Sequence, residues 1–458
     1  MSLVELVESD AEQAIERFGG FHQRYTPYFS TQTRTMAKEA KQYLHGQLLC
    51  QRRGNMVQFE KIVPKSNSQS LNHFISNSPW QEEPLLDDIA RDVSKCIGDW
   101  EHGSLHMDES GFPKEGNHSV GVKRQYCGRL GKVENCQIGV FLGYTHQCCR
   151  VLLDKRLYLP RDWVNDQERR KECGVPKEVV FRSKAQLGLE MVREAQSRKI
   201  PYAWVGMDCH YGQQQWLLEE LENDGELYIA DIPSDCRVWL EQPKTEIPPR
   251  KGNRGRNPTR LKVVESPMEV RQLSKQLEKR HWRGVYVRDT ERGELWTRLA
   301  CLRVYPVRDG LPGPETWLIL REDEGENKVK YQFCNAPTDT PFGRLAEMSH
   351  SRYWMERAIQ DAKGEVGLDE YELRGWRGWH HHMTMTILAM LFLLELQIDW
   401  KAKAPNLTVQ DVREILEVIL PRREITSKEI LEIIEQKHKA RISARHSHHR
   451  KQKLESKI

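Results

Sequence analysis

The sequence lacks the cysteine spacing of a zinc ribbon or of a disulfide-stapled domain. Its eleven cysteines include no C-x-x-C pair, and the closest two are the adjacent Cys148 and Cys149. Scattered cysteines of this kind are typical of proteins kept under reducing conditions, so we expect a cytoplasmic location. The N-terminal segment carries Glu5, Glu8 and Asp10 where a secretion signal would be basic and then apolar, and no secretion is expected.

A long hydrophobic run is also missing. The most apolar stretch, residues 383–394, is too short to span a bilayer and is interrupted by Thr384 and Thr386. We therefore expect no membrane partner, and we predict a buried core helix at this position. The sequence also shows no internal repeat at the periods typical of solenoids.

Neither sign of charge dominates. Charged residues make up 30% of the 458 residues and the formal net charge is +4, so composition alone does not require a nucleic-acid partner. The distribution is more informative, because basic residues concentrate at 114–132, at 250–262 and after Lys437. Such clusters suit a protein that contacts phosphates on selected faces, although they are also common on solvated surfaces. The length allows about two to four domains.

Residues 1–100 show helical periodicity and no strand pattern. Asn67 or Ser68 could cap one of the short helices in this region. Basic side chains nearby make it a candidate DNA-binding domain, whereas a helical packing domain without base contacts is the plainer alternative.

From about residue 103 the pattern changes to strands. Apolar, β-branched or aromatic runs at 136–144 and 149–154 predict a hairpin beside a strand that carries Asp108. A helix at 184–198, a strand that ends at Asp208, a helix at 214–223 and a strand at 226–230 follow. Two aspartates thus stand on neighbouring strand-like runs.

A helix across residues 351–363 would carry four polar side chains on one face: Arg352, Glu356, Gln360 and Lys363. Glu356 is a third carboxylate to join the two aspartates. Two Asp and one Glu suffice to hold two Mg²⁺ ions, because Mg²⁺ prefers oxygen ligands and keeps several of its waters. The plainer alternative is a set of exposed pairs within the helix, worth about 0.2–0.5 kcal/mol each.

Two nearby patterns need separate treatment. Glu109 is a rival to Asp108, but neighbouring side chains on a strand face opposite ways, so only one of them can face the metals. The run of three histidines at 380–382 invites a metal-ligand interpretation. Adjacent residues on a helix point about 100 degrees apart and cannot all reach one ion, so we predict a structural role for the three rings.

Several motifs together make the chain similar to the DDE transposases of bacterial insertion sequences, specifically the IS-four and IS-seven-hundred-one groups. The resemblance covers most of the chain and rests on residues 71–75 with 78–80, 107–114, 118–142, 208–212 and 352–368. The third-acid helix of this family carries a Tyr, Arg, Glu, Lys signature, and Arg352, Glu356 and Lys363 fall at its last three positions. The Tyr position is Ser349 here, and Tyr353 lies close enough in sequence to offer a substitute hydroxyl.

The resemblance implies an α/β fold, a ribonuclease-H-like catalytic core interrupted by a β-rich insertion domain, with helical N-terminal and C-terminal regions. The expected domains are a helical DNA-binding domain at 1–100, the first part of the core at 101–236, the β-strand insertion domain with a basic loop at 237–335, the second part of the core with the third acid at 336–400, and a helical C-terminal region with a basic tail at 401–458. The tail after Lys437 is basic and rich in His, and we expect it to be disordered until it meets a polyanion.

The resemblance also implies a cut-and-paste DNA transposase with Asp108, Asp208 and Glu356 as catalytic residues and metal ligands. Asp108 would bridge two Mg²⁺ ions, for which Mn²⁺ could substitute, and each of the other two acids would hold one ion. The same site would cut the element ends and join the freed 3′ hydroxyl to target DNA. The expected partners are double-stranded DNA, as terminal inverted repeats and target, and a second copy of the chain in a synaptic complex.

A set of side chains is expected to contact DNA: Arg352, Lys363, Tyr353, Lys123, Arg124, Arg254, Arg256, Trp282 and Trp296. Arg352 would hold a backbone phosphate through the paired N–H groups of its planar guanidinium, and Lys363 would hold one through the compact charge of its ammonium group. If the ends are released through a DNA hairpin, as in IS-four relatives, Trp282 or Trp296 would hold a flipped base, although a Trp in a strand is more often part of the core.

Two other functions stay open. A stand-alone metal-dependent nuclease of the same fold would not need end-specific binding. A domesticated DNA-binding protein would keep the fold without the chemistry, and the presence of all three acids argues against it. Metal-dependent nicking of element ends, and then strand transfer into a second DNA, would separate the three possibilities.

Overall fold

The computed structural model describes residues 3–30, 34–50, 54–249, 258–290, 293–325, 328–401 and 403–455. Its N-terminal region is helical, as predicted, with α1 (Leu3–Tyr25), α2 (Ala37–Leu49), α3 (Met56–Ile62), α4 (Ser68–Ser76) and α5 (Glu82–Ile97). Asn67 begins α4, because its side chain accepts a hydrogen bond from the Ser70 backbone N–H at 3.0 Å. The predicted helix start is therefore confirmed.

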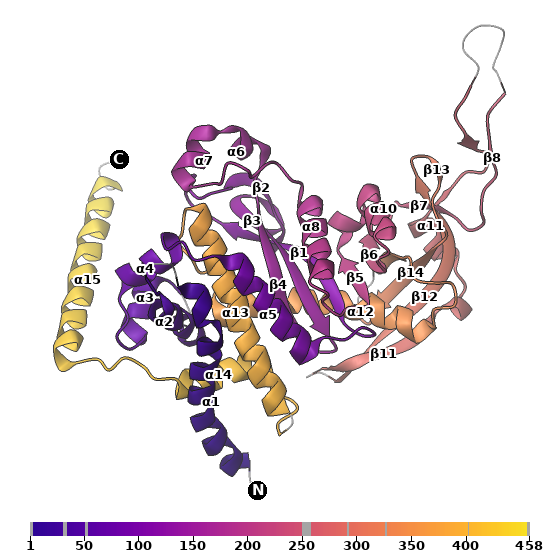
Figure 1. Ribbon diagram of the computed structural model, residues 1–458. Helices are drawn as coiled ribbons and strands as arrows, with labels where there is room; N and C mark the ends of the chain where they lie inside the picture. Colours follow the sequence, from indigo (N-terminus) through magenta and orange to yellow (C-terminus); the bar gives the residue numbers. More distant parts are fainter. Residues whose placement is uncertain are drawn as a thin grey trace.

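The helix α13 (Trp376–Lys401) joins this bundle to the sheet. It packs against α2, α4 and α5 and also against β4, and Figure 1 shows it between the two parts of the molecule. Its side chains from Gly378 to Leu394 are buried, which confirms the predicted core helix and extends it beyond 383–394. Among the described residues, α13 is the one helix long and apolar enough to cross a membrane, and most of its surface is covered by protein.

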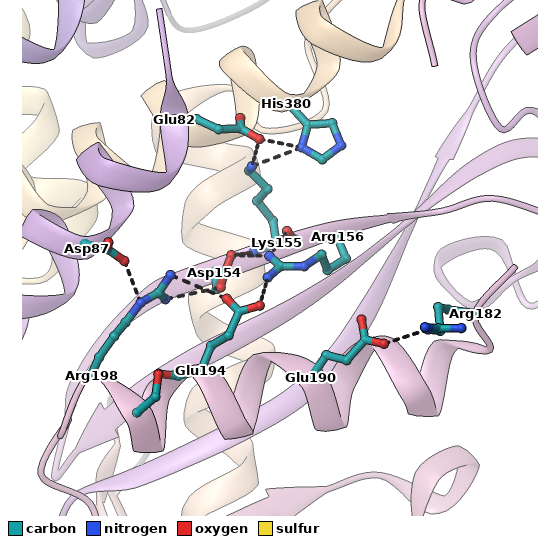
Figure 2. A network of polar contacts seen from close by, with 11 residues as sticks. Glu82, Asp87, Asp154, Lys155, Arg156, Arg182, Glu190, Glu194, Arg198 and His380 are labelled. Carbon is teal, nitrogen blue, oxygen red and sulfur yellow. Dashed lines mark hydrogen bonds and ion pairs between the residues drawn. The ribbon is translucent and has the colours of Figure 1, made fainter. Parts of the chain in front are cut away.

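The three histidines at 380–382 face three different partners. The Nδ1 atom of the first lies 2.8 Å from Glu82 Oε1, the second stacks on Trp80 with ring centroids 3.7 Å apart, and the Nδ1 atom of the third lies 2.8 Å from the Tyr43 hydroxyl. The predicted structural role is confirmed. Glu82 also pairs with Lys155 of β4 at 2.8 Å, so α5, α13 and the sheet meet in a buried ionic cluster (Figure 2).

One half of the large sheet contains β1 (Ser104–Pro113), β2 (Lys123–Cys127), β3 (Lys132–His146), β4 (Cys149–Tyr158), β5 (Trp204–Met207) and β6 (Tyr228–Ile232). β3 pairs antiparallel with β1 and β4, as predicted, whereas β5 runs parallel to both β1 and β6. The order across this half is β4-β3-β1-β5-β6. Between β4 and β6 the chain forms the helices α6 (Arg161–Asn165), α7 (Gln167–Cys173), α8 (Lys184–Ser197), α9 (Cys209–Gly212) and α10 (Gln215–Asn223). The sequence did not predict β2.

Two helices cover opposite faces of this sheet at close range. Gly188 of α8 lies so close to Met107 that a Cβ added at Gly188 would come within 2.6 Å of the Met107 sulfur. Gly143 of β3 likewise makes room for Met355 of α12 (Phe342–Val366). Because side chains alternate along β1, Met107 points toward α8 and its neighbour Asp108 points toward α12. The contact of Met355 with Gly143 thus places α12 against β3, the neighbour of the strand that carries Asp108.

The segment between β6 and α12 is rich in strands, as predicted. It contains β7 (Arg237–Trp239), β8 (Thr245–Glu246), β9 (Lys262–Val263), β10 (Met268–Glu269), α11 (Val270–Gln276), β11 (Arg283–Thr290), β12 (Gly293–Arg308), β13 (Leu311–Pro312), β14 (Thr316–Asp323) and β15 (Val329–Cys334). β15 pairs antiparallel with β6, so these strands continue the core sheet (Figure 1). Most of the predicted basic loop, including Arg254 and Arg256, lies outside the described residues.

The C-terminal region contains α14 (Val409–Ile419) and α15 (Ser427–Glu455). α14 begins with a capping box formed by Thr408 and Asp411. The prediction of a disordered tail after Lys437 is wrong, because α15 continues through it (Figure 1). The side chains of residues 430–450 are exposed, so the helix is supported by its own backbone and by residues of high helix propensity rather than by packing.

Candidate active site

Asp108 lies in the middle of β1 and faces α12. Its neighbour Glu109 points to the opposite face, where its Oε1 atom accepts a hydrogen bond from Lys184 Nζ of α8 at 2.6 Å. The predicted alternation, by which Asp108 and Glu109 face opposite sides of the sheet, is therefore present in the structure. Burial, together with the charge of nearby Asp208, raises the pKa of Asp108 to about 7.

Asp208 stands directly after β5, at the start of the short helix α9 (Cys209–Gly212). Its side chain accepts hydrogen bonds from the backbone N–H groups of His210 and Tyr211 at 2.9 and 3.3 Å, which fixes the carboxylate at the helix N-terminus. β5 is parallel to β1, and Met207 pairs with Met107. Asp208 and Asp108 directly follow these two paired residues, so they occupy equivalent positions on adjacent strands. Burial also raises the pKa of Asp208.

Arg352 of α12 connects the third acid to the sheet. Its Nη2 atom lies 2.5 Å from Glu356 Oε1, one helical turn along, and its Nη1 atom lies 3.9 Å from Asp108 Oδ2. Its Nε atom lies 2.9 Å from an Oδ2 atom of Asp231 on β6. One guanidinium thus gathers carboxylates from two strands and a helix.

Asp231 is a member of this cluster that the sequence did not suggest. It also accepts a hydrogen bond from Gln332 Nε2 of β15 at 2.7 Å. The signal was available, because the apolar run Tyr228–Ala230 ends in an aspartate just as the run before Asp208 does. β6 is parallel to β5 and pairs Ala230 with Met207, so both aspartates occupy the same edge.

The acids have the chemistry of a Mg²⁺ or Mn²⁺ site, because carboxylate oxygens are the ligands these ions prefer. Within the described part of the chain, however, no three His, Cys, Asp or Glu side chains lie close enough together to hold one ion. The Arg352 guanidinium stands among the carboxylates and pairs with three of them. Burial, with added repulsion from Asp208, raises the pKa of Asp108, and a bound divalent cation would oppose both effects.

The remaining residues of the predicted helix signature, Lys363, Ser349 and Tyr353, lie in three different surroundings. Lys363 Nζ lies 6.0 Å from the centre of the Phe112 ring on β1, so it faces the strand of Asp108, and burial lowers its pKa. Ser349 is fully buried and donates to Gln332 Oε1 at 2.5 Å, so its hydroxyl faces the sheet interior. Tyr353 is 40% exposed, and the Arg288 guanidinium lies over its ring, 3.6 Å from the ring centre.

A cleft of about 1020 Å³ opens beside Arg352 and Glu356. One wall is α12 with Tyr353, and the other is formed by β11, β12 and β14 of the segment before α12. The cleft wall includes the cationic side chains of Arg288 and Arg321. The acid cluster therefore borders a groove with aromatic and basic walls.

The other predicted DNA contacts are dispersed. Lys123 of β2 forms an ion pair with Asp162, and Arg124 beside it is exposed. Trp282 is partly buried against the core, whereas Trp296 of β12 is 45% exposed and meets Tyr286 edge to face at 5.8 Å. The structure therefore favours Trp296 over Trp282 as an accessible ring, and it does not bring Lys123 or Arg124 into contact with the acids.

Comparison with known proteins agrees with this arrangement. A family model described as DDE superfamily endonuclease matches residues 24–294, which is more than half of the chain and includes Asp108 and Asp208. The chain is also 27% identical, over 347 residues, to a protein from Microchaete diplosiphon described as a probable transposase for insertion sequence element IS701, and the match covers 73% of this chain and 77% of that one. The two findings agree with the motifs in the sequence, and the chain belongs to the DDE endonuclease superfamily as a DDE transposase of the insertion-sequence type.

Proposed function

We propose that this protein is a cut-and-paste DNA transposase in which Asp108, Asp208 and Glu356 carry out the phosphodiester chemistry. The observation that carries the proposal is that Arg352 pairs with Asp108 of β1 and Glu356 of α12, while Asp208 after β5 is near enough to Asp108 to raise its pKa. The raised pKa of Asp108 supports a functional role, because strongly perturbed carboxyl pKa values are enriched at functional sites.

We further propose that the half-sheet β4-β3-β1-β5-β6 with α12 is a ribonuclease-H-like core and that residues 237–335 form a β-strand insertion within it. The antiparallel β1, β3 and β4 followed by parallel β5 and β6 support this assignment. Residues 1–100 would then be a helical DNA-binding region attached through α13.

Asp108, Asp208 and Glu356 would hold two Mg²⁺ or Mn²⁺ ions. When bound, these ions would neutralise negative charge on the attacking and leaving oxygens of the phosphodiester. The Glu356 side chain is 54% exposed, so it is free to turn away from Arg352 toward the sheet. Asp208 has less freedom, because two backbone N–H groups hold its carboxylate in place.

Arg352 and Lys363 would bind backbone phosphates near the cut. The planar guanidinium suits a phosphate because it can donate two parallel hydrogen bonds. Asp231 acts as a positioning residue, since it contacts the Nε atom of Arg352 and is itself held by Gln332. Released from Glu356, the guanidinium keeps this anchor and presents its two Nη groups to the DNA.

The cleft beside Glu356 would receive a DNA end. Arg288 stacked on Tyr353 offers a cation and a flat ring to an unpaired nucleotide. Trp296 on β12 is a second exposed ring close by. The complex would contain terminal inverted repeats, target DNA and a second copy of the chain, acting on the bacterial nucleoid in the cytoplasm.

The proposal is tested with Asp208→Asn. Asparagine keeps an oxygen that can accept the N-cap hydrogen bonds, so the local fold is retained while the charge is lost. We expect metal-dependent nicking of DNA with element ends to fall at least about a hundredfold, while end binding in a gel-shift assay is nearly unchanged. Strand transfer into a second DNA, measured with the unaltered protein, distinguishes a transposase from a simple nuclease.

Asp235→Asn is the matched control, because Asp235 is an exposed acid close to the site in sequence. It should cut like the unaltered protein. A variant of Asp208 that lost DNA binding as severely as cleavage would contradict the assignment of Asp208 to chemistry.

A further inference from the structure

The turn between β3 and β4 places two adjacent cysteines beside the cleft. Gln147 turns the chain with a φ of 54°, Cys148 follows it, and Cys149 begins β4. Cys148 forms part of the cleft wall together with Tyr353 and Trp354 of α12. A small molecule that enters the cleft can therefore reach this residue.

Two donors converge on the Cys148 sulfur. Lys401, the last residue of α13, donates from Nζ to Cys148 Sγ at 2.7 Å. The thiol of Cys149 also donates to it. An ammonium and a thiol donor both favour the thiolate over the thiol, and the pKa of Cys148 falls to about 5 as a result, with the Cys149 hydrogen bond as the larger cause.

Other charged groups around the turn do not oppose this arrangement. Arg150 donates from Nη1 to the Cys148 carbonyl at 2.9 Å and adds positive charge. His146 is turned toward the Ile97 carbonyl at 3.2 Å and toward Asp99 at 4.0 Å. Cys96 provides a contrast, because it is exposed but burial of its sulfur and the Glu395 charge raise its pKa.

We propose that Cys148 is a modification site, a thiolate held by Lys401 and Cys149 that reacts with small electrophiles and hydroperoxides in the cleft. With a hydroperoxide, the sulfur attacks the terminal oxygen, an S–O bond forms and the O–O bond breaks. The sulfur is oxidised by two electrons to the sulfenate level, and the peroxide is reduced to an alkoxide or hydroxide that takes its proton from solvent. The proposal is independent of the DNA chemistry proposed above.

An adduct on Cys148 would lie on a turn that is bonded to the acid-bearing helix. Arg150 joins the Cys148 carbonyl to Asp361 of α12, with Nε and Nη2 at 2.7 and 2.6 Å from Asp361 Oδ2. Asp361 lies on the same helix as Glu356. One buried arginine, Arg150, therefore connects the Cys148 turn to the helix that carries Glu356.

The test compares two cysteines within the unaltered protein. It is treated with iodoacetamide at pH 6, and the labelling of each cysteine is followed by peptide mass spectrometry. We expect Cys148 to be labelled about tenfold faster than Cys96, since its larger thiolate fraction outweighs the lower nucleophilicity of a low-pKa thiolate. Hydrogen peroxide followed by a sulfenate-trapping reagent should mark Cys148 and leave Cys96 unmarked.

Variants then test the role of the lysine. Lys401→Met should move the midpoint of the Cys148 labelling profile to higher pH, whereas Lys401→Arg, which keeps a cation, should leave it low. Cys148→Ser should remove the fast-labelled peptide. Equal labelling of Cys148 and Cys96 at pH 6, or a labelling profile that Lys401→Met leaves unchanged, would overturn the proposal.

Discussion

Two buried clusters of charge lie on the same sheet and are built in opposite ways. In the first, shown in Figure 2, acids and bases are matched: Asp154 of β4 meets Arg156 at 2.7 Å and Arg198 at 3.3 Å, and Lys155 meets Glu82 at 2.8 Å. In the second, carboxylates on β1, β6 and α12 share the guanidinium of Arg352.

The pKa shifts of the two clusters have opposite signs. Burial opposes ionisation of Asp154, but the charges of Arg156, Lys155 and Arg198 outweigh it and lower the pKa. At Asp108, burial and the charge of Asp208 act in the same direction, and the pKa rises to about 7. The matched cluster joins the helical bundle to the sheet, whereas in the unmatched one three carboxylates share one guanidinium. The opposite signs of the two shifts agree with this difference in composition.

The largest effect is expected from Lys155→Met in the matched cluster. Lys155 is 1% exposed, and its removal leaves Glu82 buried without its ammonium partner. Breaking a buried pair in this way typically lowers the free energy of unfolding by about 3–5 kcal/mol. Urea unfolding followed by circular dichroism measures the change.

The control is Arg182→Met, which breaks the exposed pair of Arg182 and Glu190 in the same region (Figure 2). Its side chains are 46% and 43% exposed, so the loss should stay below about 1 kcal/mol. Equal losses from the two variants would mean that the Lys155 pair is not a buried structural link.

The second prediction uses pH to compare the clusters without added metal. The pKa of Asp108 is raised in the folded state. Protonated Asp108 therefore contributes fully to the free energy of unfolding at acid pH, and this contribution is lost as pH rises from about 4 to about 7. The loss amounts to about 1.4 kcal/mol per pH unit at most. The pKa of Asp154 is lowered, so its contribution is present at neutral pH and is lost as pH falls.

Replacing each acid by asparagine should therefore give opposite pH profiles. Relative to the unaltered protein, Asp108→Asn should gain stability as pH rises from 5 to 8. Asp154→Asn should be most destabilised at neutral pH and least at acid pH. Unfolding free energies at several pH values in EDTA measure both, and profiles of the same sign would contradict the comparison.

Much of this site could be predicted from local pattern. Period-two alternation showed that only one of Asp108 and Glu109 can face the site, and the family resemblance chose Asp108. Period-3.6 spacing placed Arg352 with Glu356 on one face of α12, because it depends only on backbone geometry. The fusion of β15 with β6 was not predictable, since strand pairing between distant segments leaves no local mark. Asp231 was missed although its local signal was present, because it ends a strand-like run as Asp208 does. Its place beside Arg352 depends on the pairing of β6 with β5.

The C-terminal tail shows the opposite error. Its charge and lack of an apolar stripe indicated disorder, but Lys, Arg, Glu and Ala are strong helix formers, and α15 needs no packed face to form. Composition therefore predicted correctly that the segment would not join the core. It did not predict the conformation of an exposed segment.

The smallest effect, and the most informative about the unmatched cluster, is expected from Arg352→Gln. In the absence of DNA, Arg352 supplies the positive charge that the surrounding carboxylates need, so it competes with any divalent cation for them. Removing the guanidinium should tighten Mn²⁺ binding about tenfold, which corresponds to about 1.4 kcal/mol. Paramagnetic resonance of free Mn²⁺ measures this without any cleavage assay.

The matched control is Arg357→Gln on the same helix, because Arg357 contacts Gln360 and Asp361 rather than the candidate metal ligands. It should leave Mn²⁺ affinity unchanged. If Arg352→Gln also left it unchanged, or weakened it, Arg352 would not be the competing cation. The acids would then stay apart for a reason other than Arg352, and DNA would have to bring them together by moving α12 rather than by drawing away one side chain.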